Sequence, residues 1–137
     1  MITLETLPKA TAQEVFDQVV QHMLRQGEPA ISDSGTCSYR YDTGDRVLKC
    51  AAGCLIADSE YCKYFDDAYD SSWSSLVNEG LVPNTHVKLI TELQHIHDKS
   101  SPDYWEKDLQ QFAFYNDLQY NPLPSDYIPD ETQLSLF

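Results

Sequence analysis

The sequence lacks any apolar run of the roughly 18 residues that a membrane-spanning helix needs. Its first ten residues, MITLETLPKA, also lack the basic and apolar zones of a secretory signal. We therefore expect a cytoplasmic protein that does not contact a membrane. Because thiols stay reduced in the cytoplasm, the four cysteines are not expected to form disulfides.

Positive charge is scarce. Nine Lys and Arg residues against 22 Asp and Glu residues give a net charge of −13, and no Lys or Arg follows Lys107. Since negative charge repels a phosphate backbone, direct binding to nucleic acid is not expected. The acidity is typical of a well-solvated surface; the alternative interpretation is that it mimics the charge of DNA towards a basic protein.

Recognisable catalytic constellations are missing as well. There is no glycine-rich phosphate loop, dinucleotide fingerprint or nucleophile elbow. His95 and His97 would lie about 200° apart on a helix, so they cannot face one metal ion together. Nothing in the spacing supports Cys54 with His97 as a nucleophile and its base. We expect no cofactor, and the pattern favours a binding protein over an enzyme.

The cysteines do not have the usual spacing of a zinc site. Cys37, Cys50, Cys54 and Cys62 are separated by 12, 3 and 7 residues. Zinc sites usually combine two close pairs, and only Cys50 and Cys54 approach that pattern. Free, mostly buried cysteines are the favoured interpretation, with a structural zinc site built from all four as the alternative.

Hydrophobic periodicity predicts the first elements. Thr11 and Glu14 have capping-box spacing, and apolar residues recur at helical spacing over 12–26. The runs CSYRY and RVLKC flank a turn at 42–45, which predicts an antiparallel hairpin between residues 37 and 50. The small residues that follow, within 50–56, indicate a close approach of two backbone segments.

The second half of the domain is predicted to be helical. Residues 58–70 mix carboxylates with aromatic rings, which favours a loop packed by its aromatics, with a protein-binding face as the alternative. Helices are expected over 72–78, over 84–99, and from Ser101, where Pro102 suits a first helical turn. We therefore expect a small α+β domain, with about four helices and a short antiparallel hairpin or sheet, over residues 1–118.

Residues 119–137 have a different character. Prolines at 122, 124 and 129 each remove a backbone donor and exclude a helix or central strand. Asp126, Asp130 and Glu131 add negative charge. The composition predicts an extended, acidic, proline-rich arm that ends in the short apolar segment QLSLF.

This last segment, made of Gln133, Leu134, Ser135, Leu136 and Phe137, resembles a known docking motif. Bacterial DNA polymerases, mismatch-repair proteins and replication regulators use the pattern QL, then Ser or Asp, then LF to bind the β sliding clamp. The resemblance implies that Gln133 makes polar anchoring contacts while Leu136 and Phe137 fill the deep part of the clamp's groove. The alternative is that the segment folds back onto its own domain.

The expected function is thus that of a phage-encoded inhibitor or modulator of host DNA replication, which competes with the polymerase and clamp loader for the clamp. The alternatives are an adaptor that the clamp recruits for phage replication, and an acidic DNA mimic that inhibits another host protein, such as a defence protein. The block LKCAAGCLIADSEY, together with TAQEVFDQV, resembles an uncharacterised group of small phage and bacterial proteins over residues 1–118. That group implies no activity.

Overall fold

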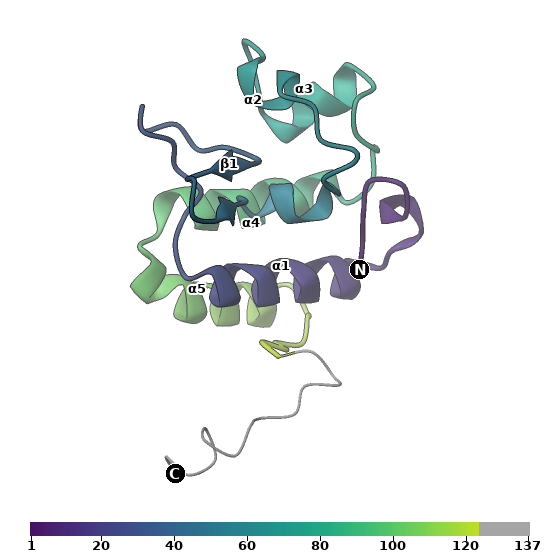
Figure 1. Cartoon of the computed structure of the whole chain (residues 1–137). Helices are drawn as coiled ribbons and strands as arrows, with labels where there is room; N and C mark the ends of the chain where they lie inside the picture. The colour runs from purple at the N-terminus through teal and green to yellow at the C-terminus, as the bar shows by residue number, and fades with distance from the viewer. Residues whose placement is uncertain (124–137) are drawn as a thin grey trace.

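The computed structural model describes residues 1–123 (Figure 1). Within them lie five α-helices and one two-stranded antiparallel sheet, which confirms the predicted α+β class with one helix more than the four expected. The long helices are α1 (Ala12–Gln26), α4 (Val87–Lys99) and α5 (Pro102–Tyr115). The shorter elements are α2 (Tyr64–Asp67), α3 (Trp73–Asn78), the 3-10 helices η1 (Leu7–Lys9) and η2 (Ala52–Leu55), and the strands β1 (Tyr41–Asp42) and β2 (Val47–Leu48).

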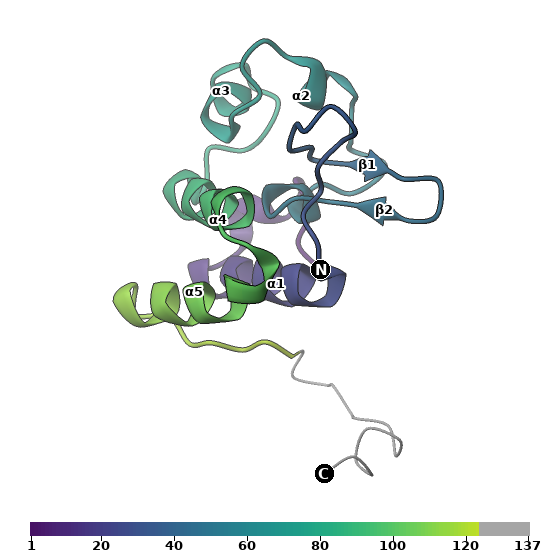
Figure 2. The same ribbon diagram turned by 90° about the vertical axis from the view of Figure 1, so that its left-hand side faces the viewer.

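The three long helices pack against one another. Helix α1 contacts α4 and α5, α4 contacts α5, and η2 contacts both α1 and α4. Helix α3 packs on α4, and in both views α2 and α3 lie beyond α4, away from α1 and α5 (Figures 1 and 2). The hairpin projects to one side of this stack (Figure 2).

The core lies where α1, α4 and α5 meet. Apolar residues at helical spacing bury one face of each helix, as the sequence pattern predicts. The fully buried side chains are Val15, Phe16, Val19, Val20 and Met23 on α1, Ile90 and Leu93 on α4, and Trp105, Leu109 and Ala113 on α5. Each large one stabilises the fold by about 1.5–3 kcal/mol through its removal from water.

Helix α1 has the termini that its sequence predicts. The N–H of Glu14 donates to Oγ1 of Thr11 (3.1 Å), and the N–H of Thr11 donates to the Glu14 carboxylate (2.9 Å). At the other end Gly27 adopts a left-handed conformation, with φ of 75°, and its N–H donates to the carbonyl of Met23. Both ends are therefore capped by the protein's own groups rather than by water.

The hairpin forms between residues 37 and 50, but its strands are shorter than the flanking runs suggest. Cys37 leaves the hairpin to bridge Ile31, and the N–H of Tyr39 donates to the carboxylate of Asp66 (2.7 Å) instead of to a partner strand. Only two residues of each strand remain paired, Tyr41 with Leu48 and Asp42 with Val47. Contacts outside the sheet therefore occupy backbone groups that a longer hairpin would pair between its strands.

Two helical boundaries differ from the prediction. The expected helix over 84–99 begins only at Val87, because His86 takes a left-handed conformation (φ 55°) and its Nε2–H donates to the carbonyl of Ala10 (2.7 Å). The additional helix, α2, is a single turn inside the aromatic stretch 58–70, where Phe65 is buried. A one-turn helix has no periodicity from which to predict it.

The predicted close approach within 50–56 is confirmed at Gly53. A Cβ atom added there would lie 2.1 Å from the carbonyl oxygen of Tyr39. The backbone of η2 thus touches the backbone of the segment that leads into β1. Only glycine leaves room for this contact.

The segment Gln133–Phe137 and the arm from residue 124 onward lie outside the described residues. Over residues 1–123, none of the helices has both the length and the apolar character needed to cross a bilayer.

Candidate functional site

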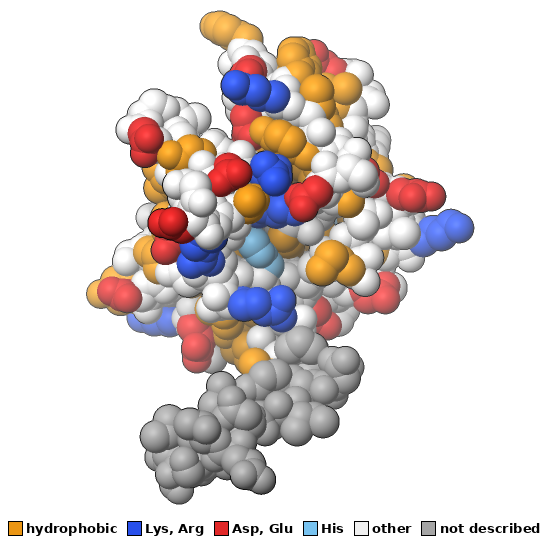
Figure 3. All heavy atoms as spheres, viewed as in Figure 1, with side chains coloured by type: hydrophobic (Ala, Val, Ile, Leu, Met, Phe, Trp, Pro, Cys, Tyr) orange, Lys and Arg blue, Asp and Glu red, His pale blue; other side chains and the backbone are white. Residues whose placement is uncertain are grey.

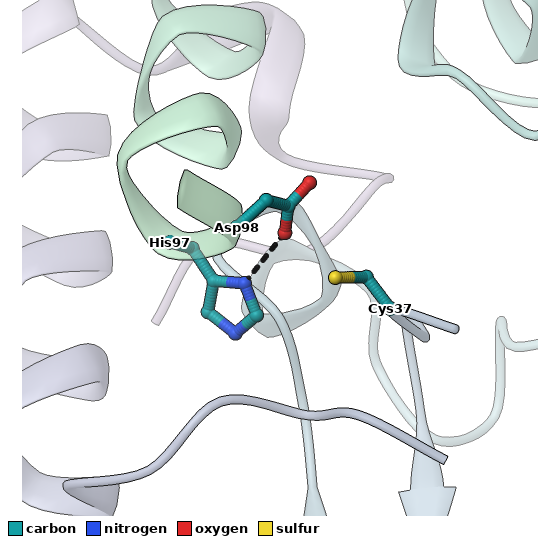
Figure 4. A group of neighbouring side chains, drawn as sticks. All are labelled: Cys37, His97 and Asp98. Carbon is teal, nitrogen blue, oxygen red and sulfur yellow. Dashed lines mark hydrogen bonds and ion pairs between the residues drawn. The ribbon is translucent and has the colours of Figure 1, made fainter. Parts of the chain in front are cut away.

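One cluster of possible metal-binding or catalytic groups forms within residues 1–123. It consists of Cys37, from the segment before β1, and of His97 and Asp98 from the last turn of α4 (Figure 4). Their ligand atoms all lie within 4.8 Å of one another. The Nδ1–H group of His97 donates to Oδ1 of Asp98 over 2.8 Å.

The hydrogen bonds of His97 fix where its proton is. The backbone N–H of Ala30 donates to Nε2 over 3.2 Å, so this nitrogen is an acceptor and the ring carries its proton on Nδ1. The imidazole is buried and stacks on Trp105, with 5.5 Å between ring centroids. Both nitrogens are therefore engaged, and neither is free to accept a proton from a thiol.

Asp98 is the acceptor at the centre of a wider network. Its Oδ1 also accepts from Nε2–H of Gln94 (2.7 Å), whose Oε1 accepts from the N–H of Ala52 (2.9 Å). Helix α4 is thereby tied to the loop at Ala30 on one side and to η2 on the other. The network joins three segments that are distant in the sequence and positions Cys37 beside the carboxylate.

The environment of Cys37 disfavours its thiolate form. Burial, and then the hydrogen bond to Asp98, raise its pKa to about 11, so little thiolate forms near neutrality. Burial likewise raises the pKa of Cys50, and it raises that of Cys54 to about 12. Cys62 is exposed. Within the described part of the chain, Cys37 alone among the four cysteines belongs to a cluster of possible metal ligands.

Metal binding by this cluster would break existing bonds. A cation on Nδ1 of His97 would displace the proton now shared with Asp98, and the proton that moved to Nε2 would face the N–H of Ala30. We interpret the hydrogen-bonded network of His97, Asp98 and Gln94 as structural, and call it the clasp because it ties α4 to the loop at Ala30 and to η2.

The clasp borders an open cavity of about 300 Å³, whose wall includes Cys37, Asp98 and the exposed His95.

This interpretation predicts the effect of removing the carboxylate. Asp98→Ala leaves the buried Nδ1–H of His97 and the amide of Gln94 without an acceptor, and should lower the free energy of unfolding by roughly 2–4 kcal/mol. Asp98→Asn retains an acceptor oxygen and should lose about half as much. Urea unfolding measures both, and Asp45→Ala, in the exposed turn of the hairpin, should change stability by less than about 0.5 kcal/mol. Equal losses in all three variants would contradict the clasp.

Helix α1 has a second distinctive feature, a set of glutamines that bind backbone. Each of three glutamines uses its amide oxygen to accept a backbone N–H and its amide nitrogen to donate to the carbonyl of the same residue. The pairs, with distances of 2.6–2.9 Å, are Gln13 with Gln119, Gln18 with Ile2, and Gln26 with Lys49. Helix α1 thus binds three other segments of the chain through hydrogen bonds to their backbone.

Helix α1 also holds the start of the predicted arm. Beyond the pairing of Gln13 with Gln119, Nε2–H of Gln21 donates to the carbonyl of Asn121 (3.1 Å), and Nδ2–H of Asn121 donates to Asp17 (3.2 Å). The contacts of the arm with the domain therefore extend at least to Asn121.

A groove of about 770 Å³ lies along α1. Its wall includes Ile2, Gln21, Arg25 and Lys49, and Leu123 lines it where the described chain ends. The view onto α1 in Figure 3 shows a histidine bordered by Lys or Arg side chains on this side of the molecule. The wall of the groove thus combines the cations Arg25 and Lys49 with the carboxylates Glu14 and Asp17.

His22 in the groove wall predicts a pH dependence of stability. Burial lowers the pKa of His22, as do the nearby cations Lys49 and Arg25, while the Nε2–H bond to the carbonyl of Lys49 (2.7 Å) opposes them. The unfolded chain therefore binds this proton first as the pH falls, so the folded state loses stability from about pH 6.5 downward. In His22→Gln the free energy of unfolding should fall less steeply between pH 7 and 5.5, as measured in urea. Identical slopes would contradict this.

The sequence had pointed to residues 133–137 and to the four cysteines as candidate sites. The former lie outside the described residues, and the latter are not brought together as a set within residues 1–123. The opposed directions predicted for His95 and His97 are confirmed, since His95 is exposed and His97 is buried. The meeting of Cys37 with Asp98 had no signal in the sequence.

No family model, curated protein or solved structure matches this chain. The chain's own residues must therefore carry whatever is inferred about its function.

Proposed function

We propose that this protein binds the bacterial DNA polymerase β sliding clamp through its segment Gln133–Phe137. The observation that carries the proposal is the agreement of QLSLF with the clamp-docking motif at all five positions. Burial of three apolar side chains at about 1.5–3 kcal/mol each offsets the ordering of a short peptide, and gives an affinity in the micromolar range.

The described domain supports this role through the way it holds the arm. Backbone contacts to α1 fix the chain at Gln119 and Asn121, and nine residues then separate Leu123 from Gln133. Those residues can span at most roughly 35 Å, at about 3.3–3.6 Å per residue. A bound peptide would therefore keep the folded domain close to the clamp's groove.

The proposed consequence is competition in the cytoplasm of a bacterial host. A phage-encoded protein of this kind displaces the polymerase and clamp loader, whose docking peptides resemble this one. A lone peptide competes weakly, whereas a domain that adds bulk or a second contact raises the effective concentration. In the cluster of Cys37, His97 and Asp98, both nitrogens of His97 are engaged in hydrogen bonds.

Clamp-dependent DNA synthesis on a primed template tests the proposal. The intact chain should bind the clamp and inhibit synthesis, and a chain without residues 133–137 should do neither. Binding without inhibition would favour the alternative of an adaptor delivered to replication forks. Equal binding by both chains would contradict docking through the segment.

The charge of −13 favours a second candidate, mimicry of DNA by the folded domain. A mimic bound to a basic surface should lose affinity for the clamp with rising salt more steeply than the isolated pentapeptide does. Equal salt slopes would remove this candidate and leave the peptide docking intact.

A further inference from the structure

The cavity beside the clasp has the size of a small-molecule site. Its volume of about 300 Å³ lies at the lower end of the range that is typical of such sites, roughly 300–1,000 Å³. Four segments that are distant in the sequence build its wall, namely residues 37–39, Cys50, residues 71–73, and Thr91, Gln94, His95 and Asp98 of α4. The hydroxyl of Tyr39 donates to the carbonyl of Ser71 and joins two of these segments. The fold itself therefore holds the wall in place.

Asp98 is the only carboxylate in the wall that the described residues form, and they contribute no Lys or Arg to it. Burial raises the pKa of the Cys37 and Cys50 thiols, which are therefore neutral near neutrality. Burial also raises the pKa of Asp98, but hydrogen bonds from His97 and Cys37 outweigh it and hold this pKa below its usual value. The wall thus carries one fixed negative charge.

The clasp leaves one oxygen of this carboxylate available. The N–H groups of His97 and Gln94 both donate to Oδ1 of Asp98, and in Figure 4 the other oxygen, Oδ2, points away from His97. The side chain of Asp98 is 27% exposed. Because a carboxylate oxygen has two lone pairs, Oδ2 can accept a further hydrogen bond, and a charged donor would make the strongest one.

Two aromatic side chains provide the apolar part of the wall. The rings of Tyr39 and Trp73 lie tilted to each other with 6.0 Å between their centroids. Trp73 is buried, and its Nε1–H has no acceptor among residues 1–123, so the protein does not satisfy every polar group of this wall. Aromatic rings pack against an apolar stem and attract a cation. The carboxylates Asp66 and Asp70, which act on Tyr39, add to the negative potential, whereas Lys99 does not line the cavity.

We propose that this cavity binds a small organic cation, with an ammonium or amidinium group against Oδ2 of Asp98 and an apolar part against the rings of Tyr39 and Trp73. A carboxylate beside aromatic rings is complementary to that chemistry and repels an anion. The domain then has a binding site of its own, separate from the segment Gln133–Phe137. The inference does not rest on the proposed function.

Titration of the intact chain with phenethylamine, followed by two-dimensional proton–nitrogen NMR, tests the proposal. The indole N–H signal of Trp73, identified by its loss in Trp73→Phe, should shift and saturate with a dissociation constant of about 1 mM or below. The backbone amide of Gly44, in the hairpin turn outside the wall, should not move. Phenethyl alcohol lacks the charge and hydrocinnamate reverses it, so both should bind at least roughly tenfold more weakly.

Two variants separate the charge from the cavity. Asp98→Asn keeps an acceptor oxygen for His97, and should weaken phenethylamine binding at least roughly tenfold while leaving the affinity for phenethyl alcohol unchanged. Thr91→Phe leaves the clasp intact but reduces the cavity, so it should weaken the binding of both probes. Its control is Gln111→Phe, on the exposed side of α5 outside the wall, which should weaken neither.

The lack of a saturable shift up to about 10 mM phenethylamine would overturn the inference. Equal affinity for the three probes would do so too, as would unchanged phenethylamine binding by Asp98→Asn. Shifts of the same size at Gly44 would also reject the site, because they would indicate general attraction to an acidic surface. The clamp is absent from all these measurements, so their outcome is independent of the docking test.

Discussion

The double variant Leu136→Ala, Phe137→Ala is expected to bind the β sliding clamp at least roughly 100-fold more weakly than the unaltered chain. Each side chain should contribute about 1.5–3 kcal/mol through burial in the clamp's groove, and every 1.4 kcal/mol is tenfold in affinity. The two substitutions together thus remove about 3–6 kcal/mol. Isothermal titration of the purified clamp measures the difference.

Ser135→Asp provides a matched control, because the docking motif accepts Ser or Asp at its third position. This variant should keep its affinity within a few-fold, although it adds a negative charge between the two leucines. If binding to the clamp depended only on the overall hydrophobicity of the segment, Ser135→Asp would also bind more weakly. Equal binding by the unaltered chain and the double alanine variant would show that the segment is not the docking element.

Gly53→Ala is expected to be the most damaging single substitution in the domain. The new Cβ would lie 2.1 Å from the carbonyl oxygen of Tyr39 and 2.9 Å from its carbonyl carbon. Both are backbone atoms, so no side chain can turn aside, and η2 must separate from the hairpin segment. We expect a loss of roughly 3 kcal/mol or more in the free energy of unfolding, a large part of the 5–15 kcal/mol that is typical of a domain.

Gly44→Ala is the control for Gly53→Ala. It tests the cost of replacing a glycine whose backbone conformation favours glycine but whose added Cβ makes no close contact. Gly44 has a φ of +96° in the hairpin turn, and an added Cβ there meets no atom within 4 Å. Its cost should be the backbone strain alone, about 1–2 kcal/mol. Thermal or urea unfolding measures the stability of both variants. Equal losses in Gly53→Ala and Gly44→Ala would contradict the close-contact explanation.

Local signals predicted much of the fold. The capping pair Thr11 and Glu14 fixed the start of α1, and its apolar spacing identified the face that is buried. Pro102 likewise marked the start of α5, which begins at that residue, although the side chain of Ser101 makes no capping hydrogen bond. These features lie within one turn of helix, so they can be read without knowledge of the tertiary structure.

Contacts between distant residues explain what could not be predicted. The late start of α4 depends on His86 reaching the carbonyl of Ala10, and the short strands depend on Asp66 binding the N–H of Tyr39. The clasp at Asp98 was hidden for another reason. His95, His97 and Asp98 resemble an acid–base cluster in the sequence, but helix geometry argued against a shared site, and neighbouring residues on a helix rarely face each other, so the hydrogen bond between His97 and Asp98 was not expected.

The glutamine contacts of α1 also determine when the domain can finish folding during synthesis. Helix α1 is complete once Gln26 has been made, yet its partner α5 begins only at Pro102 and the backbone held by Gln13 belongs to Gln119. At 5–20 residues per second, the apolar face of α1 waits several seconds for the helices that cover it. The apolar face of α1 is therefore fully covered only when nearly the whole domain has emerged.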